Sequence, residues 1–191
     1  MVLVMWVRSS GTEIKELVTA WLAISFAFAV GFFGFTLRGM LISLFTIGVA
    51  FVLHELAHKL VAQSYGCWAE FRMDVTMLIL MIIIAFFGVV FAAPGAVMIY
   101  GFITREQNGK ISLAGPLMNL ALVVVFFPLT LFNGTIGDVG RVGVWINSWI
   151  ALFNLIPFGP LDGRKILAWD ASVYSITLVA ALGAFVFSML L

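Results

Sequence analysis

The chain has 191 residues, of which 63% are hydrophobic and 10% are charged, and its formal net charge is +1. Soluble domains carry about 25% charged residues, so the composition excludes a soluble globular enzyme and predicts a polytopic membrane protein. We expect the lipid bilayer, and no nucleic acid, as a partner. The single cysteine, Cys67, excludes an internal disulfide.

Five apolar segments are predicted to form transmembrane helices, because about 20 uncharged residues cross the hydrocarbon core of a bilayer. Together they predict an all-α helical bundle that forms one transmembrane domain over 1–191. The last segment ends with the chain, which is typical of a piece of a longer protein. The predicted spans are 17–37, 40–65, 113–132, 142–162 and 171–191.

The segment between the second and third spans, 66–104, has a different pattern. Apolar and polar residues alternate from Cys67 to Val75, which indicates a half-exposed strand. The apolar run that follows ends at Pro94 and Gly95, a turn signal. We expect a small membrane-associated element, made of a strand and a re-entrant or interfacial hairpin, in place of another crossing.

The distribution of positive charge favours this re-entrant topology. If 76–103 dips in and returns, eight of the ten Lys and Arg residues lie on the side of the N-terminus, and two, Arg38 and Arg141, lie opposite. A single crossing would divide them five against five. Cytoplasmic loops are enriched in Lys and Arg, so the N-terminus is predicted to be cytoplasmic, and Lys59 is expected to snorkel to that side.

The second span contains both histidines of the chain, His54 and His58, with Glu55 between them. Helix positions i and i+4 lie on one face, so both imidazoles can reach one ion. This is the H-E-x-x-H pattern of zinc peptidases. Polar groups in a lipid span are costly unless they are paired, coordinated or hydrated, which favours metal binding over structural polar packing.

A third ligand must come from another residue type, since catalytic zinc usually has three protein ligands and one open position. Cys67 is one candidate, although a lone cysteine is usually a small apolar residue. The other candidates are the carboxylates Glu13, Glu16, Glu55, Glu70, Asp74, Glu106, Asp138, Asp162 and Asp170.

Asp162 differs from the other carboxylates because it follows a helix that breaks at Pro157, Gly159 and Pro160. Irregular backbone at membrane depth is tolerated where it lines a site or a wet cavity. In the re-entrant topology, the helix before Asp162 ends in the same half of the membrane as the histidines. The alternative is that Asp162 only caps a helix ahead of Gly163.

The two motifs in this order resemble the site-2 proteases, which are zinc metallopeptidases that cleave transmembrane segments. The resemblance is carried by His-Glu-Leu-Ala-His at 54–58 and, about a hundred residues later, by Asn-x-x-Pro-x-x-x-Leu-Asp-Gly at 154–163. Gly109–Asn119 also resembles the loop that leads into the core helix of that family. The resemblance covers 40–163.

The resemblance implies that one Zn²⁺ is held by His54, His58 and Asp162, and that Glu55 is the general base. It implies that Asn154 helps to hold or polarise the substrate carbonyl. Hydrogen bonding between helices is an alternative role for Asn154 and for Asn119. The implied activity is intramembrane zinc endopeptidase, acting on transmembrane protein substrates in regulated intramembrane proteolysis.

A substrate helix must unwind before cleavage, and we expect the 67–75 strand or the arms beside Pro94 to pair with it. Two other functions are a membrane metal transporter and an inactive homologue that binds membrane segments. A transporter needs ligands along a path through both leaflets, whereas these candidates gather at one depth, and all expected catalytic residues are present. The apolar composition without a targeting segment fits the inner membrane of a prokaryotic cell.

Overall fold

The computed structural model describes residues 8–90 and 94–191. It confirms the predicted fold class, a helical membrane bundle with a small β element between the second and third long helical segments. Its elements in chain order are α1 (Gly11–Phe33), α2 (Leu37–Ser43), η1 (Leu44–Gly48), α3 (Val49–Ser64), β1 (Trp68–Met73), α4 (Val75–Ala85), β2 (Gly95–Tyr100), α5 (Arg105–Phe126), η2 (Phe127–Leu131), α6 (Gly134–Asn154), α7 (Asp162–Trp169) and α8 (Ala171–Ser188).

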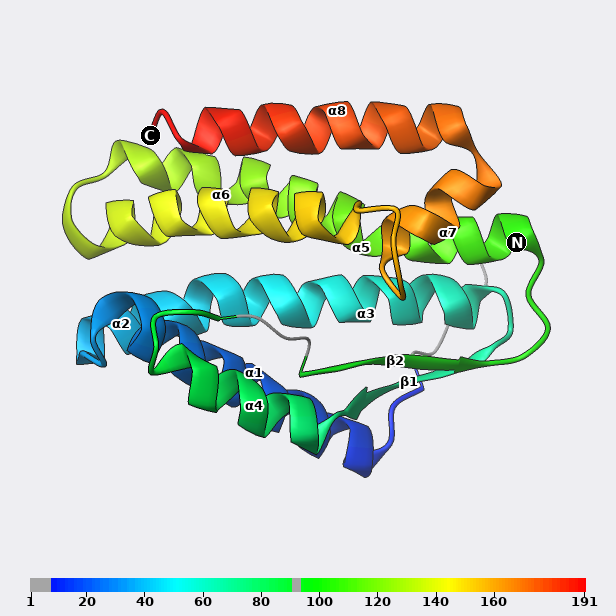
Figure 1. The fold of residues 1–191 in the computed structure, drawn as a ribbon, viewed down its shortest axis with the longest axis horizontal. Helices are drawn as coiled ribbons and strands as arrows, with labels where there is room; N and C mark the ends of the chain where they lie inside the picture. Colours follow the sequence, from blue (N-terminus) through cyan, green and yellow to red (C-terminus); the bar gives the residue numbers. More distant parts are fainter. Residues whose placement is uncertain (1–7, 91–93) are drawn as a thin grey trace.

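The long helices run side by side along the longest axis of the molecule (Figure 1). In this view α8 forms one outer layer, α5 and α6 form the next, and α3 follows. The hairpin of β1 and β2, together with α1 and α4, covers the other side of α3. The helix with the H-E-x-x-H motif is therefore central, with α5, α6 and α8 on one side and the hairpin, α1 and α4 on the other.

Four helical segments among the described residues are long and apolar enough to cross a membrane. The helix α6 is not among them, because Asp138, Arg141 and Asn147 lower its hydropathy. That the predicted span at 142–162 crosses the membrane stays a prediction. The four segments are Gly11–Phe33, Leu37–Ser64, Arg105–Leu131 and Ala171–Ser188.

Two of the helices begin earlier than the apolar runs that predicted them, because polar caps determine where they start. The Ser10 side chain accepts a hydrogen bond from the Glu13 amide at the start of α1. A capping box starts α5, where the side chains of Thr104 and Gln107 each accept a hydrogen bond from the backbone amide of the other. Hydropathy detects the membrane-depth part of such helices and misses their polar first turns.

A π-helical turn, η1, interrupts the second long segment between α2 and α3. Such turns are rare and usually single. The indole nitrogen of Trp21 on α1 donates a hydrogen bond of 3.1 Å to the Leu44 carbonyl at its start. At its end Gly48 lies against Trp21 so closely that a Cβ would overlap the indole ring. The turn is thus where α1 packs on the segment that leads to His54.

The predicted strand is present as β1, which pairs antiparallel with a second strand, β2, with Phe71 opposite Val97. Between them α4 has 11 residues, a length of roughly 16 Å, about half of the hydrocarbon core. The chain therefore goes out along β1 and returns along β2, so that Tyr100 ends opposite Trp68. Residues 91–93 of the predicted re-entrant segment lie outside the described residues.

Carboxylates of α1 occupy the outer edge of β1. Glu13 accepts a hydrogen bond of 3.0 Å from the Phe71 amide, and Glu16 accepts one of 3.0 Å from the Met73 amide. These amides point away from β2, because alternate residues of an antiparallel pair turn their N–H groups outward. Two acidic side chains thus take the place of a neighbouring strand.

Glu13 also forms an ion pair inside the protein with Lys59, the residue after His58. The two residues are 1% and 0% exposed, and the Lys59 Nζ lies 2.5 Å from a Glu13 carboxylate oxygen and 2.6 Å from the Ser9 hydroxyl. The expectation that Lys59 snorkels to the surface is wrong, because a buried carboxylate on α1 pairs with it. The pair ties the motif helix to α1.

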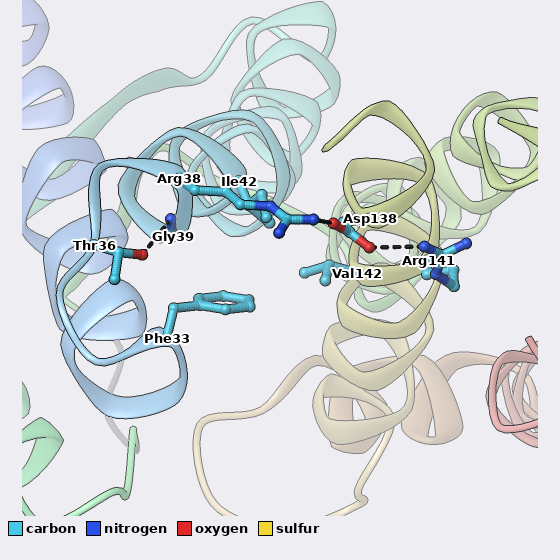
Figure 2. A pocket seen from close by; sticks show the side chains of 8 residues that line it. All are labelled: Phe33, Thr36, Arg38, Gly39, Ile42, Asp138, Arg141 and Val142. Carbon is cyan, nitrogen blue, oxygen red and sulfur yellow. Dashed lines mark hydrogen bonds and ion pairs between the residues drawn. The ribbon is translucent and has the colours of Figure 1, made fainter. Parts of the chain in front are cut away.

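Arg38 and Arg141, the two cations expected on the side of the membrane opposite the N-terminus, lie close together near the start of α2 and α6. Asp138 forms ion pairs with both Arg38 and Arg141 (Figure 2). A cavity of about 300 Å³ lies beside them, lined also by Phe33 and Thr36. The two arginines at this end of the bundle therefore share one carboxylate.

Removing one partner of the buried pair is expected to destabilise the fold. Lys59→Met leaves the Glu13 carboxylate buried without a cation, which costs about 3–5 kcal/mol. The double variant Lys59→Met with Glu13→Gln removes both charges and is expected to regain most of this loss. Melting temperatures of the purified proteins in one detergent measure both, and equal melting of parent and single variant would contradict the role of the pair.

Candidate metal centre

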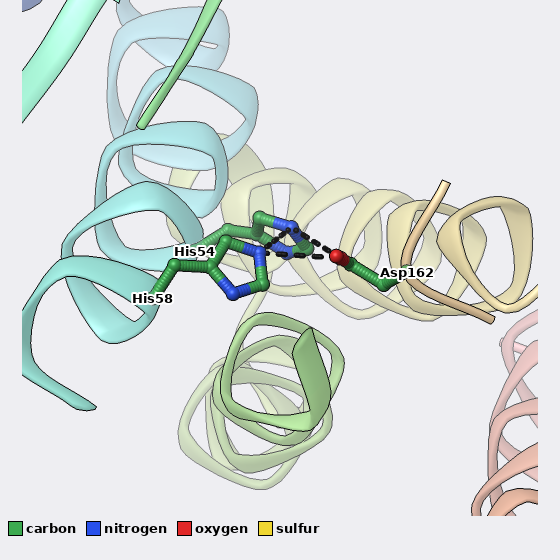
Figure 3. A group of neighbouring side chains, drawn as sticks. All are labelled: His54, His58 and Asp162. Carbon is green, nitrogen blue, oxygen red and sulfur yellow. Dashed lines mark hydrogen bonds and ion pairs between the residues drawn. The ribbon is translucent and has the colours of Figure 1, made fainter. Parts of the chain in front are cut away.

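Three buried side chains from two distant parts of the chain meet between α3 and the start of α7 (Figure 3). His54 and His58 project from α3, and Asp162 is the first residue of α7. Their residues are 4%, 8% and 7% exposed. The two Nε2 atoms lie 3.0 Å apart, and the Asp162 Oδ2 lies 3.4 Å from that of His54 and 3.2 Å from that of His58.

This triangle has the size that a zinc ion requires. Ligand atoms at about 2.0–2.1 Å from a tetrahedral zinc are roughly 3.3 Å apart, close to the three separations observed. Two imidazoles and one carboxylate are also a donor set that zinc uses. The three residues therefore fit one zinc ion and leave a fourth position for water or substrate.

Hydrogen bonds on the far side of each imidazole set its orientation. The His54 Nδ1 donates to the Asn119 side-chain oxygen at 2.6 Å, and the His58 Nδ1 donates to the Ile111 carbonyl at 2.7 Å. Both acceptors are carbonyl oxygens without a proton, so Nδ1 is the protonated nitrogen in each ring. The unprotonated Nε2 atoms then face each other and Asp162, as ligands of a metal must.

Asn119 belongs to a polar network that joins α3, α5 and α6. Its amide nitrogen donates to the Asn147 side-chain oxygen at 2.9 Å and to the Ala50 carbonyl at 3.3 Å. Asn147 in turn donates to the Gly143 carbonyl of its own helix. Both asparagines are fully buried. Asn119 therefore joins helices, as expected, and also orients the His54 ring.

Gly115 brings α5 against the Nε2 atoms of the two histidines. A Cβ at this position would lie 2.5 Å from the Nε2 atoms of both His54 and His58. No side chain fits there without displacing an imidazole or filling the space between them. Gly115 belongs to the segment that resembles the family, but its role depends on a helix contact that the sequence alone does not show.

The broken backbone after α6 brings Asp162 to the histidines. The helix α6 ends at Asn154, and α7 begins at Asp162. Gly163 packs on the last turn before the break, where a Cβ would overlap the Leu155 carbonyl. Asp162 is therefore buried at the start of a new helix, with Lys165 as its nearest cation at 3.9 Å.

Glu55 and Asn154 lie outside the triangle. A Glu55 carboxylate oxygen accepts a hydrogen bond of 3.0 Å from the Val97 amide of β2, so this side chain lies between the motif helix and the hairpin. The Asn154 amide nitrogen donates at 3.0 Å to the Ile150 carbonyl, within its own helix. The structure thus brings together three of the five predicted site residues, and the roles of all five stay predictions.

The alternative third ligands have other surroundings. Cys67 is buried among Ala62, Ala69 and Ile111 and lies outside the metal-competent group. The other carboxylates outside the motif have structural partners: Lys59 for Glu13, the Met73 amide for Glu16, Arg72 for Glu70, the start of α4 for Asp74, Lys110 for Glu106, Arg38 and Arg141 for Asp138, and the start of α8 for Asp170.

Known proteins with similar sequences are metalloproteases by name. The chain is 42% identical over 187 residues to "Putative zinc metalloprotease MJ0611" of Methanocaldococcus jannaschii, a match that covers 95% of this chain and 97% of the relative. It is 30% identical over 145 residues to "Putative zinc metalloprotease YwhC" of Bacillus subtilis, covering 64% of this chain and 65% of that protein.

A third relative, "Zinc metalloprotease MJ0392" of Methanocaldococcus jannaschii, is 31% identical over 126 residues, which are 62% of this chain and 31% of the relative. The search against family models finds no match, and no solved structure matches the chain.

Apolar helices around a zinc-sized ligand triangle, together with a relative that matches over nearly its whole length, define the class as the membrane-embedded zinc metalloproteases. Within this class the chain belongs to the site-2 protease family, and its cofactor is zinc.

The close approach of Gly115 predicts a loss of metal on enlargement. Gly115→Ala is expected to lower the zinc content of the purified protein severalfold, because its methyl group would meet both Nε2 atoms. Gly183→Ala on α8 is the matched control, since a Cβ there meets nothing within 4 Å. Elemental analysis after dialysis measures the zinc, and full zinc occupancy in Gly115→Ala would show that the α5 approach is not critical.

Proposed function

We propose that the chain is an intramembrane zinc endopeptidase that hydrolyses peptide bonds in or near transmembrane segments of protein substrates, as in regulated intramembrane proteolysis. The observation that carries this is the burial of the His54, His58 and Asp162 triangle inside a bundle of apolar helices. The names of the relatives support proteolysis with zinc, and the apolar surroundings support its location within the membrane.

In this proposal His54, His58 and Asp162 hold one zinc ion. When bound, zinc lowers the pKa of its water toward neutrality and polarises the carbonyl of the scissile peptide. The protein fixes the two imidazole rings, because the Asn119 and Ile111 oxygens accept hydrogen bonds from their Nδ1 atoms, on the side of each ring away from the metal position. The imidazoles therefore need no change of tautomer to bind the metal.

Glu55 is the proposed general base. It follows His54 directly on α3, and it accepts the proton of the attacking water on its carboxylate and later passes it to the leaving amine. Asn154 is the proposed residue that holds or polarises the substrate carbonyl. Its amide donates to the Ile150 carbonyl in the structure, so it must share or exchange that bond to contact a substrate.

Replacing the base separates catalysis from metal binding. Glu55→Gln keeps the size of the side chain and removes its basicity, so we expect cleavage of a transmembrane substrate in detergent to fall at least a hundredfold, the lower part of the range for general base catalysis. Zinc content should equal that of the parent, which serves as the control for folding.

Two other results would count against the proposal. Cleavage by Glu55→Gln at the parental rate would exclude Glu55 as the base. If neither protein cuts any transmembrane substrate although both bind zinc, the endopeptidase proposal fails. Zinc flux into proteoliposomes that survives Glu55→Gln would then identify a transporter.

We further propose that an unwound substrate segment pairs with the outer edge of β2. The amide of Val97 points away from β1 and toward Glu55, and by alternation the backbone of Ile99 faces the same way. An exposed strand edge is a template for strand addition. The 67–75 strand is less suited, because Glu13 and Glu16 of the scaffold bond two of its outer amides. On β2 the bonded outer amide is that of Val97, and its partner is Glu55, the proposed base.

Proline at Ile99 tests this pairing. Ile99→Pro removes one outward amide and leaves the bonds between β1 and β2 intact, as edge positions permit. We expect cleavage to fall about fivefold to tenfold, the loss of roughly one net hydrogen bond. Ile99→Ala, which keeps the amide, is the control, and both variants should retain zinc. Equal cleavage by both variants would exclude Ile99 from substrate pairing.

The positions of the Lys and Arg side chains support an orientation of the protein in the membrane. Arg105, Arg164 and Lys165 lie at the end of the bundle where α5 and α7 begin, and Arg38 and Arg141 lie at the other end (Figures 1 and 2). We propose that the first end, where α1 also begins, faces the cytoplasm, in the inner membrane of a prokaryotic cell. Water would then reach the metal centre from the cytoplasmic side.

A further inference from the structure

A second cavity lies between the start of α5 and α7, apart from the metal centre. It has a volume of about 320 Å³ and is lined by Arg105, Asn108, Gly159, Arg164, Lys165 and Ala168. Three of these side chains are cationic, one is an amide, and none is acidic. Such a lining favours a ligand with concentrated negative charge.

Most of the positive charge of this cavity has no acidic partner within the part of the chain that the structure describes. Arg105 and Arg164 form no ion pair with any described carboxylate, and Lys165 lies 3.9 Å from its nearest, Asp162. The cavity at the opposite end also contains two arginines, but there Asp138 pairs with both (Figure 2). The two ends of the bundle are therefore built differently, and only this one leaves its arginines without an acid.

The backbone of the cavity also suits an anion. Arg105 and Asn108 lie in the first turn of α5, where helix N–H groups and the macrodipole favour negative charge. Gly159 has a φ of +61° and no side chain, so a bulky ligand can approach its backbone closely. Guanidinium groups match the geometry of phosphate oxygens, which makes a phosphate the anion that this set of donors fits best.

The position of the cavity in the bundle indicates the source of the phosphate. Arg105 begins the apolar segment Arg105–Leu131, one of the four that can cross a membrane. The end of such a segment lies at the depth of lipid headgroups, and basic pockets between helices at this depth bind anionic headgroups. A free phosphate compound has the same chemistry but does not gain from this depth.

We propose that Arg105, Arg164 and Lys165 bind the phosphate of an anionic lipid headgroup. The site lies on the same short helix as a proposed zinc ligand, because α7 begins with Asp162 and presents Arg164 and Lys165 on its first turn. A headgroup held there joins α7 to α5 at the membrane surface. It would draw Lys165 toward the phosphate and away from the Asp162 carboxylate.

The test is lipid retention, which does not depend on proteolysis. The whole chain is placed in nanodiscs of phosphatidylcholine with a minor fraction of phosphatidylglycerol, and bound lipid is counted by native mass spectrometry. The test variant is Arg105→Gln with Arg164→Gln. The control is Arg8→Gln with Lys15→Gln, which removes two positive charges near the start of α1 and leaves the cavity intact.

We expect the parent and the control to retain one phosphatidylglycerol, and the test variant to bind it roughly thirtyfold more weakly. Zinc content measured on each protein verifies that it is folded. Equal loss of bound phosphatidylglycerol in both double variants would show that only the general surface charge matters. Unchanged lipid binding in the test variant would exclude the site. Both results overturn the proposal.

A further comparison distinguishes the two sources of phosphate. Inorganic phosphate is added to the protein in nanodiscs of phosphatidylcholine alone, and to the protein with phosphatidylglycerol bound. The lipid assignment predicts that inorganic phosphate at millimolar concentration neither binds detectably nor displaces phosphatidylglycerol. Binding of inorganic phosphate that depends on Arg105 and Arg164, with no preference for the lipid, would overturn the lipid assignment.

Discussion

The hydrogen bond from His54 to Asn119 is the interaction on which the centre of this protein depends. It sets the tautomer of one proposed zinc ligand, and through Asn147 it joins three helices by buried side chains. Buried polar networks stabilise a structure only when every member is satisfied. Gly115 lies one helical turn before Asn119, so the contact that satisfies His54 also brings α5 against the Nε2 atoms of both histidines. Packing of α5 on α3 therefore orients the two histidines of the triangle, and α7 supplies its third member, Asp162.

The hairpin follows the same rule of full satisfaction, with different results on its two edges. On β1 the outward amides are bonded by carboxylates of α1, and one of these carboxylates is itself neutralised by Lys59. On β2 the Val97 amide bonds Glu55, a side chain beside the metal centre. The outer edge of β1 is thus covered by α1, whereas the outer edge of β2 faces Glu55 and the metal centre. A short sheet with one closed edge is also protected from pairing with other chains on that side.

The sequence predicted the fold class, the β1 strand and the residues of the triangle, because these depend on patterns that are local or on motifs. Period-two alternation located β1, and the His54, Glu55 and His58 spacing located the central helix. The partners of these elements could not be predicted, because they come from distant segments. The residues around Glu13 do not show that it bonds the edge of a strand near residue 71. The residues around Gly115 do not show that a side chain there would meet the histidines. Lys59 was misplaced for the same reason, since hydropathy does not show a carboxylate on another helix.

The π-helical turn at 44–48 has a consequence for how the metal centre can vary among relatives. A π turn accommodates one residue more than the α-helix it interrupts, whereas in a regular helix one residue changes the direction of all later side chains by roughly 100°. Loss of a single residue within the turn would therefore leave a regular α-helix in which His54 and His58 still face Asp162. Loss of one residue between the turn and His54 would rotate both histidines away. Relatives can thus differ by one residue at this turn and keep the same site.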